Sequence, residues 1–479
     1  MNYQNAGMLS PYKVLDMTQG ACSLSGKIFA DLGANVIKIE SPNGDLSRFR
    51  GPFINDKPHI DSSYEWHYLN ANKRGITLDL EKNKDLEIFK KLIIDTDFLF
   101  DSFDPGYLKS KGLSYQDLKK INPKLIMTSI TPFGQDGPYM NYLGPDLVVW
   151  SLGGYMWMCG DPERAPVRIS ITPQSYYHAS ASAASAALIA LYKRNQNEVG
   201  DFIDQSVQHT GPWFLTHTYQ WYEYEDVILK REGGWRQFGT TRTRTLYPCK
   251  DGYVVFMSFG GRLGESVQQG VIGWMEKEGE IPDYLKDFDW STFDALNTPE
   301  KDREKVFGAI GEFLKTKTKS ELLEAAVRER YTMAPVNHLG DVVENPQLNS
   351  RQFWHSNFNK NLDRALKYPG APFLSSEFEM KYYRSAPSLG EHNDEIKAKF
   401  VVCDWSTTTK EIAEAISEIE GITVQYKQID LHGTIEEVDI PKSSFVYTIN
   451  ALEQAGKKGG GVLKWIMKYN PKKTIALGG

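Results

Sequence analysis

The sequence predicts an α/β protein with a mostly parallel sheet in a large domain, a smaller middle domain and an extra α/β segment at the C-terminus. Three observations support this prediction. Short β-branched runs alternate with stretches of helical periodicity before residue 131, aromatic residues crowd together after residue 212, and a new strand-helix-strand pattern begins after residue 398. A chain of 479 residues is also long for a single core, which favours two or three domains.

The first elements form a strand-helix-strand unit. Residues 12–17 are short and β-branched, residues 24–32 have helical spacing that stops at a glycine, and residues 35–40 form a second apolar run. The turn-rich segment 41–45 closes the unit. Two strands that flank one helix are typical of a βαβ unit in a parallel sheet.

The same alternation continues along the chain. Strands are expected at 76–80, 97–101 and 125–130, and a helix with one apolar face is expected around 86–93. Ligands of such sheets bind at the carboxyl ends of the strands. We therefore expect the functional loops to follow these strands.

The later part of the chain supplies the other domains. Residues 178–192 are rich in alanine and serine, which predicts a tightly packed, buried helix. An aromatic-rich stretch at 213–244 precedes a strand at 252–257, and residues 281–329 have helical periodicity. The predicted boundaries are 1–212 for the first part of the large domain, 213–335 for the small domain, 336–398 for the return to the large domain and 399–479 for a C-terminal appendage.

The appendage has its own pattern. Strands are expected at 400–403 and 422–429, and an amphipathic helix is expected between them at 408–419. The pattern predicts a small separate α/β unit and gives no indication of its function.

Composition limits the classes of function. The chain is 41% hydrophobic and 24% charged with a formal charge of −6, which gives no electrostatic reason to expect nucleic acid or an acidic membrane as a partner. The four cysteines form no CxxC pair and no cluster with metal-ligand spacing, so reduced thiols and no metal site are expected. No stretch approaches the roughly 20 apolar residues of a membrane span. We expect a cytoplasmic protein that is neither exported nor inserted in a membrane.

Several short motifs occur in a fixed order. They are VLDMT at 14–18, ADLGANVIKIESPNGDLSR at 30–48, NANKRGITLDL at 70–80, FDPGYLKSKGLSYQDLKKINPKLI at 103–126, TPFGQDGPY at 131–139, YPCKDGYV at 247–254 and APSLGEHNDEI at 386–396. In order and spacing this set resembles the class III coenzyme A-transferases, the family of formyl-CoA, carnitine-CoA and benzylsuccinate-CoA transferases. The resemblance covers roughly residues 10–398 and leaves out the appendage.

The resemblance implies a fold and a chemistry. It implies a Rossmann-like large domain, a smaller middle domain and two chains threaded through each other as linked rings, in a homodimer or a heteromer with a homologous subunit. Coenzyme A is then a substrate, and no tightly bound cofactor is implied. An enzyme carboxylate attacks an acyl-CoA thioester, becomes an acyl anhydride and then a CoA thioester, and passes CoA to an acceptor carboxylic acid.

The resemblance also points to a nucleophile. Family members place an aspartate in a segment close to G-x-P-D-G-P-P, and the matching stretch here is GDPERAP at 160–166. Counted without a gap, Glu163 occupies the aspartate position, and Asp161 is the nearest aspartate. The extra methylene of glutamate moves the carboxylate by about 1 Å, which can cost about a hundredfold in rate. A third reading is that both are ordinary loop acids and that the site has lost its chemistry.

The CoA site that the resemblance implies departs from the family pattern. Ser41 and Ser110 stand where relatives often have basic residues, and each lost cation removes a charge-assisted contact with a phosphate. For each remaining candidate, a solvated lysine or a core side chain is an equally good reading. The candidates for binding CoA are Gln19, Lys73, Arg74, Ser102, Lys109 and Lys111, with Leu78 and Phe103 as apolar contacts for adenine.

Two other functions compete with catalysis of CoA transfer by this chain. The fold resembles that of α-methylacyl-CoA racemases too, but those need a histidine before an aspartate, and this chain reads Gly144-Pro145-Asp146. Because proline cannot transfer a proton, a racemase is disfavoured. The other alternative is a non-catalytic subunit of a heteromeric transferase. The aromatic residues Trp150, Trp157 and Trp213 would suit a bulky or aromatic acid, such as an aryl- or alkylsuccinate, although core packing explains them equally well.

Overall fold

The computed structural model describes most of the chain and divides it into two compact units. The first unit contains Met1–Val149, Pro173–Thr210 and His355–Gly479, and the second contains Trp150–Thr172 and Gly211–Trp354. The domain boundaries expected from the sequence stay a prediction beside this division. The described residues are 7–216, 218–238, 241–257, 261–288, 293–295, 297–359, 362–396, 399–404, 423–428, 445–449 and 473–477.

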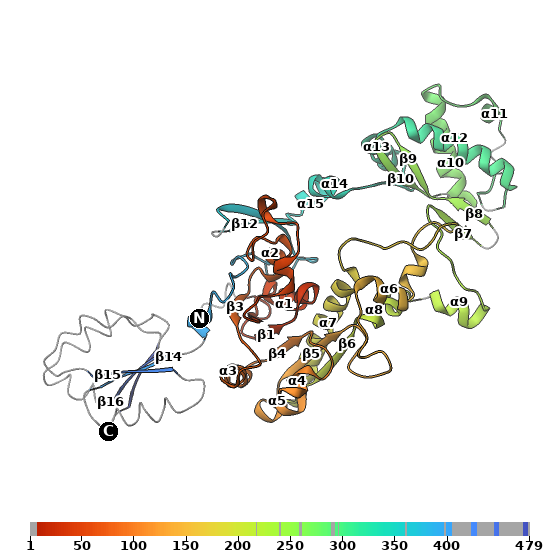
Figure 1. Cartoon of the computed structure of the whole chain (residues 1–479). Helices are drawn as coiled ribbons and strands as arrows, with labels where there is room; N and C mark the ends of the chain where they lie inside the picture. The colour runs from red at the N-terminus through yellow and green to blue at the C-terminus, as the bar shows by residue number, and fades with distance from the viewer. Residues whose placement is uncertain are drawn as a thin grey trace. The chain divides into compact units, whose positions relative to one another are not determined.

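The first unit is built on a six-stranded parallel sheet (Figure 1). The strands are β1 (Lys13–Met17), β2 (Asn35–Glu40), β3 (Arg74–Thr77), β4 (Phe98–Asp101), β5 (Ile126–Thr131) and β6 (Phe202–Ser206). Their order across the sheet is β3-β2-β1-β4-β5-β6. The strand order therefore reverses between β1 and β4, which is where doubly wound α/β sheets open a ligand crevice at their carboxyl ends.

Four of the predicted strands match the sheet closely. The fifth, expected at 76–80, lies at 74–77 instead. Thr77 pairs with Glu40, the last residue of β2, so the strand ends where its neighbour ends. The N–H of Leu78 still donates to the carbonyl of Glu40, and the chain leaves the sheet after it.

Helices cover both faces of this sheet. Leu15 and Leu99 belong to one apolar cluster with residues of α3 (Asn83–Ile93) and α5 (Tyr115–Ile121). Their neighbours Val14 and Phe98 point to the other face, where the cluster includes residues of α1 (Leu24–Asp31) and α7 (Gln174–Asn197). Alternate residues of a strand face opposite sides, so both faces of the sheet are apolar, as a doubly wound parallel sheet requires.

The alanine-rich helix α7 is only partly the buried scaffold that the sequence predicts. One face is buried, with Ala179, Ala183 and Ala187 completely covered. The opposite face is open, and Ile189 and Tyr192 are each 71% exposed. A helix packed on one side against a sheet keeps its other side free for solvent or for another chain.

The second unit has its own core around an antiparallel sheet of β9 (Leu246–Cys249), β10 (Gly252–Phe256) and β11 (Met333–Val336). The strand expected at 252–257 is therefore confirmed. The segment 334–336, expected near the return to the large domain, pairs instead with β10. The helices and hairpin strands of this unit are α6 (Asp146–Leu152, shared with the first unit), α8 (Val207–Phe214, likewise shared), α9 (Thr218–Glu225), β7 (Trp235–Phe238), β8 (Thr241–Arg244), α10 (Gly261–Lys277), α11 (Asp283–Lys286), α12 (Glu300–Thr316), α13 (Lys319–Glu329), α14 (Leu339–Glu344) and α15 (Pro346–Ser350).

The described part of the appendage is a four-stranded parallel sheet in the order β15-β14-β16-β17. The strands are β14 (Lys399–Asp404), β15 (Thr423–Gln428), β16 (Phe445–Ile449) and β17 (Lys473–Leu477). The first two correspond to the two predicted strands. The helix expected at 408–419 lies outside the described residues. Among the helices that are described, none combines the length and apolar character needed to cross a bilayer.

Candidate functional site

Three loops meet at the carboxyl edge of the sheet, where the strand order reverses. The N–H of Gln19, in the loop after β1, donates to Oγ of Ser102 after β4, at 2.8 Å. The side-chain Oε1 of Gln19 accepts from the N–H of Leu46 after β2, at 3.2 Å. Two of the predicted CoA contacts, Gln19 and Ser102, therefore lie together at the position where ligands of such sheets bind.

The loop after β1 is held in place by a hydrogen bond to the loop after β2. Gly20 has a φ of +54°, which favours glycine, and its N–H donates to Oδ1 of Asp45 at 3.1 Å. Asp45 also accepts from the N–H of Ser47 at 2.8 Å and pairs with Lys38 at 3.0 Å. The loop after β2 is thus fastened to the loop after β1 by one buried carboxylate.

A buried group of charges supports these loops. Asp16 lies 2.7 Å from Nζ of Lys73 and 3.8 Å from Nζ of Lys38, and all three side chains are completely buried. Burial alone would raise the pKa of Asp16, but Lys38 and Lys73 attract its charged form and lower that pKa overall. Burial lowers the pKa of Lys73 to about 8, despite the opposing effect of Asp16.

The two adjacent cations predicted to bind CoA are engaged within the fold. Nζ of Lys73 donates to the carbonyl of Ser23 at 2.8 Å and to Asn70 at 3.0 Å, besides its pair with Asp16. Arg74 stands at the amino end of β3 and pairs with Glu395 at 2.7 Å. Their role as phosphate contacts stays a prediction, whereas the contacts that the structure shows are internal ones.

The two expected adenine contacts, Leu78 and Phe103, lie in different surroundings. Leu78 is buried in the apolar core beside the sheet, in the same cluster as Ile39. Phe103 is half-buried, and its ring stacks on Tyr107 with 4.7 Å between ring centroids. Phe103 also lines a hollow.

That hollow has a volume of about 550 Å³ and lies beside α4 (Tyr107–Ser110) and α5. Its lining includes Phe103 and the exposed Lys109, both predicted CoA contacts. Its lining also includes Asp101, whose buried carboxyl accepts from Oγ of Ser129 at 2.5 Å. Burial raises the pKa of Asp101 to about 7, against the lowering effect of that hydrogen bond. Lys111, the remaining predicted cation, pairs with Glu81 and lies 5.6 Å from the ring of Tyr107.

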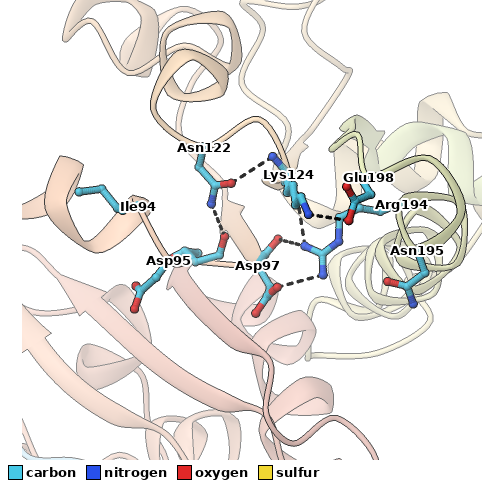
Figure 2. A pocket seen from close by; sticks show the side chains of 9 residues that line it. Ile94, Asp95, Asp97, Asn122, Lys124, Arg194, Asn195 and Glu198 are labelled. Carbon is cyan, nitrogen blue, oxygen red and sulfur yellow. Dashed lines mark hydrogen bonds and ion pairs between the residues drawn. The ribbon is translucent and has the colours of Figure 1, made fainter.

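A second hollow, of about 360 Å³, lies at the amino ends of the strands, opposite the carboxyl ends that form the crevice (Figure 2). Four of its charged side chains form two ion pairs. Arg194 pairs with Asp97 at 2.9 Å, and Lys124 pairs with Glu198 at 2.9 Å. The amide of Asn122 donates to two backbone carbonyls, at 2.9 and 2.7 Å. Because these groups use their charges within the fold and lie at the amino ends of β4 and β5, we do not place the ligand site here.

The predicted nucleophile lies in the second unit, on the loop between η5 (Tyr155–Met158) and α7. Glu163 and Asp161 are both exposed, and Asp161 lies 3.9 Å from Arg164. The guanidinium of Arg231 donates to the carbonyls of Asp161 and Arg164, at 2.9 and 3.0 Å. The backbone of this acidic loop is therefore fastened on both sides of Glu163, while the Glu163 carboxylate stays accessible to solvent.

Sequence reasoning missed one cation at the crevice. Arg50 follows η3 (Leu46–Phe49), and a β-carbon added to Gly20 would lie 3.4 Å from its Nη1. The neighbouring Arg48 is buried and bonded to Glu40 at 2.6 Å. Two arginines follow the turn-rich segment 41–45, but nothing in the sequence distinguishes the buried one from the exposed one.

Comparison with known proteins gives a consistent result. The family described as CoA-transferase family III matches residues 9–393. The chain is 36% identical over 388 residues to the BbsE subunit of succinyl-CoA:(R)-benzylsuccinate CoA-transferase from Thauera aromatica, covering 81% of this chain and 93% of that subunit. It is 26% identical to succinate–glutarate CoA-transferase from Agrobacterium fabrum, covering 84% of this chain and 97% of that enzyme.

A solved structure agrees with this likeness. A CAIB/BAIF family protein from Brucella suis superimposes with a TM-score of 0.71 at 27% sequence identity, and the match covers 82% of this chain and 99% of that one. The family match extends through both units and stops before the appendage, as the motifs predict. The chain belongs to CoA-transferase family III, the class III coenzyme A-transferases.

Proposed function

We propose that this chain is a subunit of a CoA-transferase that binds acyl-CoA in the crevice between β1 and β4 and carries the acyl group on Glu163. The observation that supports the binding site most directly is the contact between Gln19 and Ser102, which joins two strand-end loops at the switch point. Phe103 and Lys109 follow Ser102 on the same segment and offer an aromatic face and a cation.

The proposed chemistry has four steps. Glu163 attacks the thioester carbonyl of the donor. The CoA thiolate departs, and a mixed anhydride between the donor acyl group and Glu163 is formed. The thiolate attacks the glutamyl carbonyl, releases the donor acid as a carboxylate and forms a CoA thioester on Glu163. The acceptor carboxylate displaces the thiolate to give a second anhydride, and the thiolate then attacks the acceptor carbonyl, which frees Glu163 and the new acyl-CoA.

The proposed acids are dicarboxylic and bulky, such as aryl- or alkylsuccinates. The names of the relatives above include succinyl-CoA, benzylsuccinate and glutarate. Two of the aromatic residues considered earlier are exposed in the second unit, Trp157 and Trp213. Trp150 is buried and packs against Tyr155, so packing explains it and it does not support a contact with a bulky acid.

We further propose an obligate oligomer, either a homodimer of linked rings or a heteromer with a homologous subunit, located in the cytoplasm. The exposed apolar face of α7, with Ile189 and Tyr192, supports a chain-to-chain contact. The relative from Thauera aromatica is named as a subunit, which favours the heteromer.

One observation favours a second candidate, the non-catalytic subunit. Lys73 and Arg74 are engaged by acids of the fold, and Ser41 and Ser110 replace basic residues of the family pattern. A crevice with fewer available cations binds the CoA phosphates less tightly. In that case a homologous partner would carry the acyl group.

Substitution in the acidic loop separates the two candidates. Glu163→Gln keeps the size and removes the nucleophile, so turnover by the purified assembly should fall by at least a thousandfold, or about 4 kcal/mol of activation free energy. Asp161→Asn, two residues away on the same loop, is the matched control and should retain most activity. Full activity of Glu163→Gln would favour the non-catalytic subunit.

A further inference from the structure

Arg50 occupies a distinctive position at the crevice. Its side chain is 48% exposed, and its Nη1 lies directly against Gly20 in the loop after β1. The preceding turn of η3 is tied to the same loop through the contact of Leu46 with Gln19. These neighbours place the guanidinium of Arg50 beside the loop after β1, next to the proposed acyl-CoA site.

The charge of Arg50 is only partly used within the fold. The buried Arg48 makes two hydrogen bonds to Glu40, at 2.6 and 2.8 Å, and a third to Asp61 at 2.5 Å. The acid partner of Arg50 is Glu65, whose Oε1 is 3.5 Å from Nη1, which is long for a direct hydrogen bond. Since a guanidinium has five N–H donors, this pair leaves capacity to bind an anion.

The groups around Arg50 do not cancel this capacity. Burial raises the pKa of Glu65, against the lowering effect of Arg50. Asp45 is buried and already bonded to Lys38 and Ser47. Beyond Gly20, α7 places Tyr176 and Tyr177 within electrostatic range of Arg50, and burial raises both of their pKa values, so both are neutral phenols at pH 7.

We infer that Arg50 binds the free carboxylate of a dicarboxylic acyl group, the one that is not joined to CoA. This inference rests on the proposed function. A planar guanidinium matches a carboxylate through two parallel hydrogen bonds, and arginine is the preferred residue for such recognition. Two exposed apolar side chains, Leu46 and Phe49, lie on the turn that precedes the arginine and would tolerate a hydrophobic substituent on the acid.

The same guanidinium could instead hold a phosphate of CoA, so the test compares two thioesters that share CoA. Succinyl-CoA and butyryl-CoA have four acyl carbons each and differ in the terminal carboxylate. We would measure the Kd of both for the purified assembly, wild type and variants, after confirming by circular dichroism that the variants keep their melting temperature.

Arg50→Gln should weaken succinyl-CoA binding by about tenfold or more and change butyryl-CoA binding less than about twofold. Arg50→Lys should recover part of the loss, because it keeps the charge and loses the fork. Glu65→Gln is the matched control at the same site and should keep or strengthen succinyl-CoA binding, because it removes the competing carboxylate.

The other outcomes overturn the inference in distinguishable ways. Equal weakening of both thioesters by Arg50→Gln would assign Arg50 to a CoA phosphate. No change in either would show that Arg50 touches neither part of the ligand. Loss of succinyl-CoA binding in Glu65→Gln would indicate that the pair only shapes the loop. A wild-type assembly that binds neither thioester would overturn the proposed function, and this inference with it.

Discussion

Nζ of Lys73 lies 2.7 Å from Oδ2 of Asp16, and neither side chain is exposed to solvent. Asp16 belongs to β1 and Lys73 directly precedes β3, so the pair crosses the intervening strand of the sheet. Lys38, on that intervening strand, approaches the other carboxylate oxygen of Asp16 and also donates to the carbonyl of Thr18. The charge group therefore connects the body of the sheet with the loop that contains Gln19.

Removal of one charged partner from this group should lower the unfolding free energy of the first unit. Lys73→Met leaves Asp16 short of one buried cation, which typically costs about 3–5 kcal/mol of unfolding free energy. The measurement is urea denaturation of the purified assembly, followed by circular dichroism. Lys109→Met, at an exposed position, is the control and should change stability by no more than about 0.5 kcal/mol. A stable Lys73→Met protein with weakened CoA binding would support the phosphate role instead.

Asp101 should make stability depend on pH. Its pKa is raised from 3.8 to about 7, mainly by burial, so the folded protein binds a proton more tightly than the unfolded chain. Between about pH 4 and pH 7 the stability should therefore fall as pH rises, by at most about 4 kcal/mol from this group, with the full loss present above pH 7.

Asp101→Asn removes this titration and tests the sign. The melting temperature of the wild type minus that of Asp101→Asn should decrease from pH 4.5 to pH 8. The hydrogen bond from Ser129 can be kept by the amide oxygen of the variant. A difference that stays constant over this pH range would show that Asp101 keeps an ordinary pKa.

Restoring a cation on α4 should tighten CoA binding. Ser110 is exposed, and its Oγ donates to the carbonyl of Tyr107 at 2.7 Å, so a longer side chain fits without disturbing a core. Ser110→Arg should lower the KM for acyl-CoA by up to about tenfold, with little change in kcat, because uniform binding lowers KM alone. Ser110→Gln adds length without charge and should leave KM unchanged; an equal effect of both substitutions would exclude a phosphate contact.

Local periodicity was sufficient to predict five of the six strands of the large sheet, whereas β6 was not predicted. The alternation of Val14 and Leu15, and of Phe98 and Leu99, reflects a sheet that is covered on both faces, and such strands stand out as apolar runs. The end of β3 could not be predicted in the same way, since it depends on where β2 stops. The open face of α7 was also missed, because a run of small residues does not reveal how much of a helix is covered.

Side-chain partners distant in sequence were beyond prediction. Lys73 lies in a family motif, yet its partner Asp16 is 57 residues away, and nothing local shows that the ammonium is buried. The burial of Leu78 could not be predicted either, because an apolar residue after a strand suits a ligand or a core equally well. Gln19 and Ser102 lie together because loops that follow neighbouring parallel strands meet at one edge, and their role in binding CoA stays a prediction.

A single-turnover labelling experiment can identify the carboxylate that carries the acyl group, which we propose to be Glu163. The purified assembly is mixed with a stoichiometric amount of acyl-CoA, trapped with hydroxylamine or borohydride, digested and mapped by mass spectrometry. We expect a modified carboxyl in the peptide that contains Glu163, absent in Glu163→Gln and present in Asp161→Asn. A label found solely on a carboxylate of another subunit, with Glu163 unmodified, would contradict this proposal.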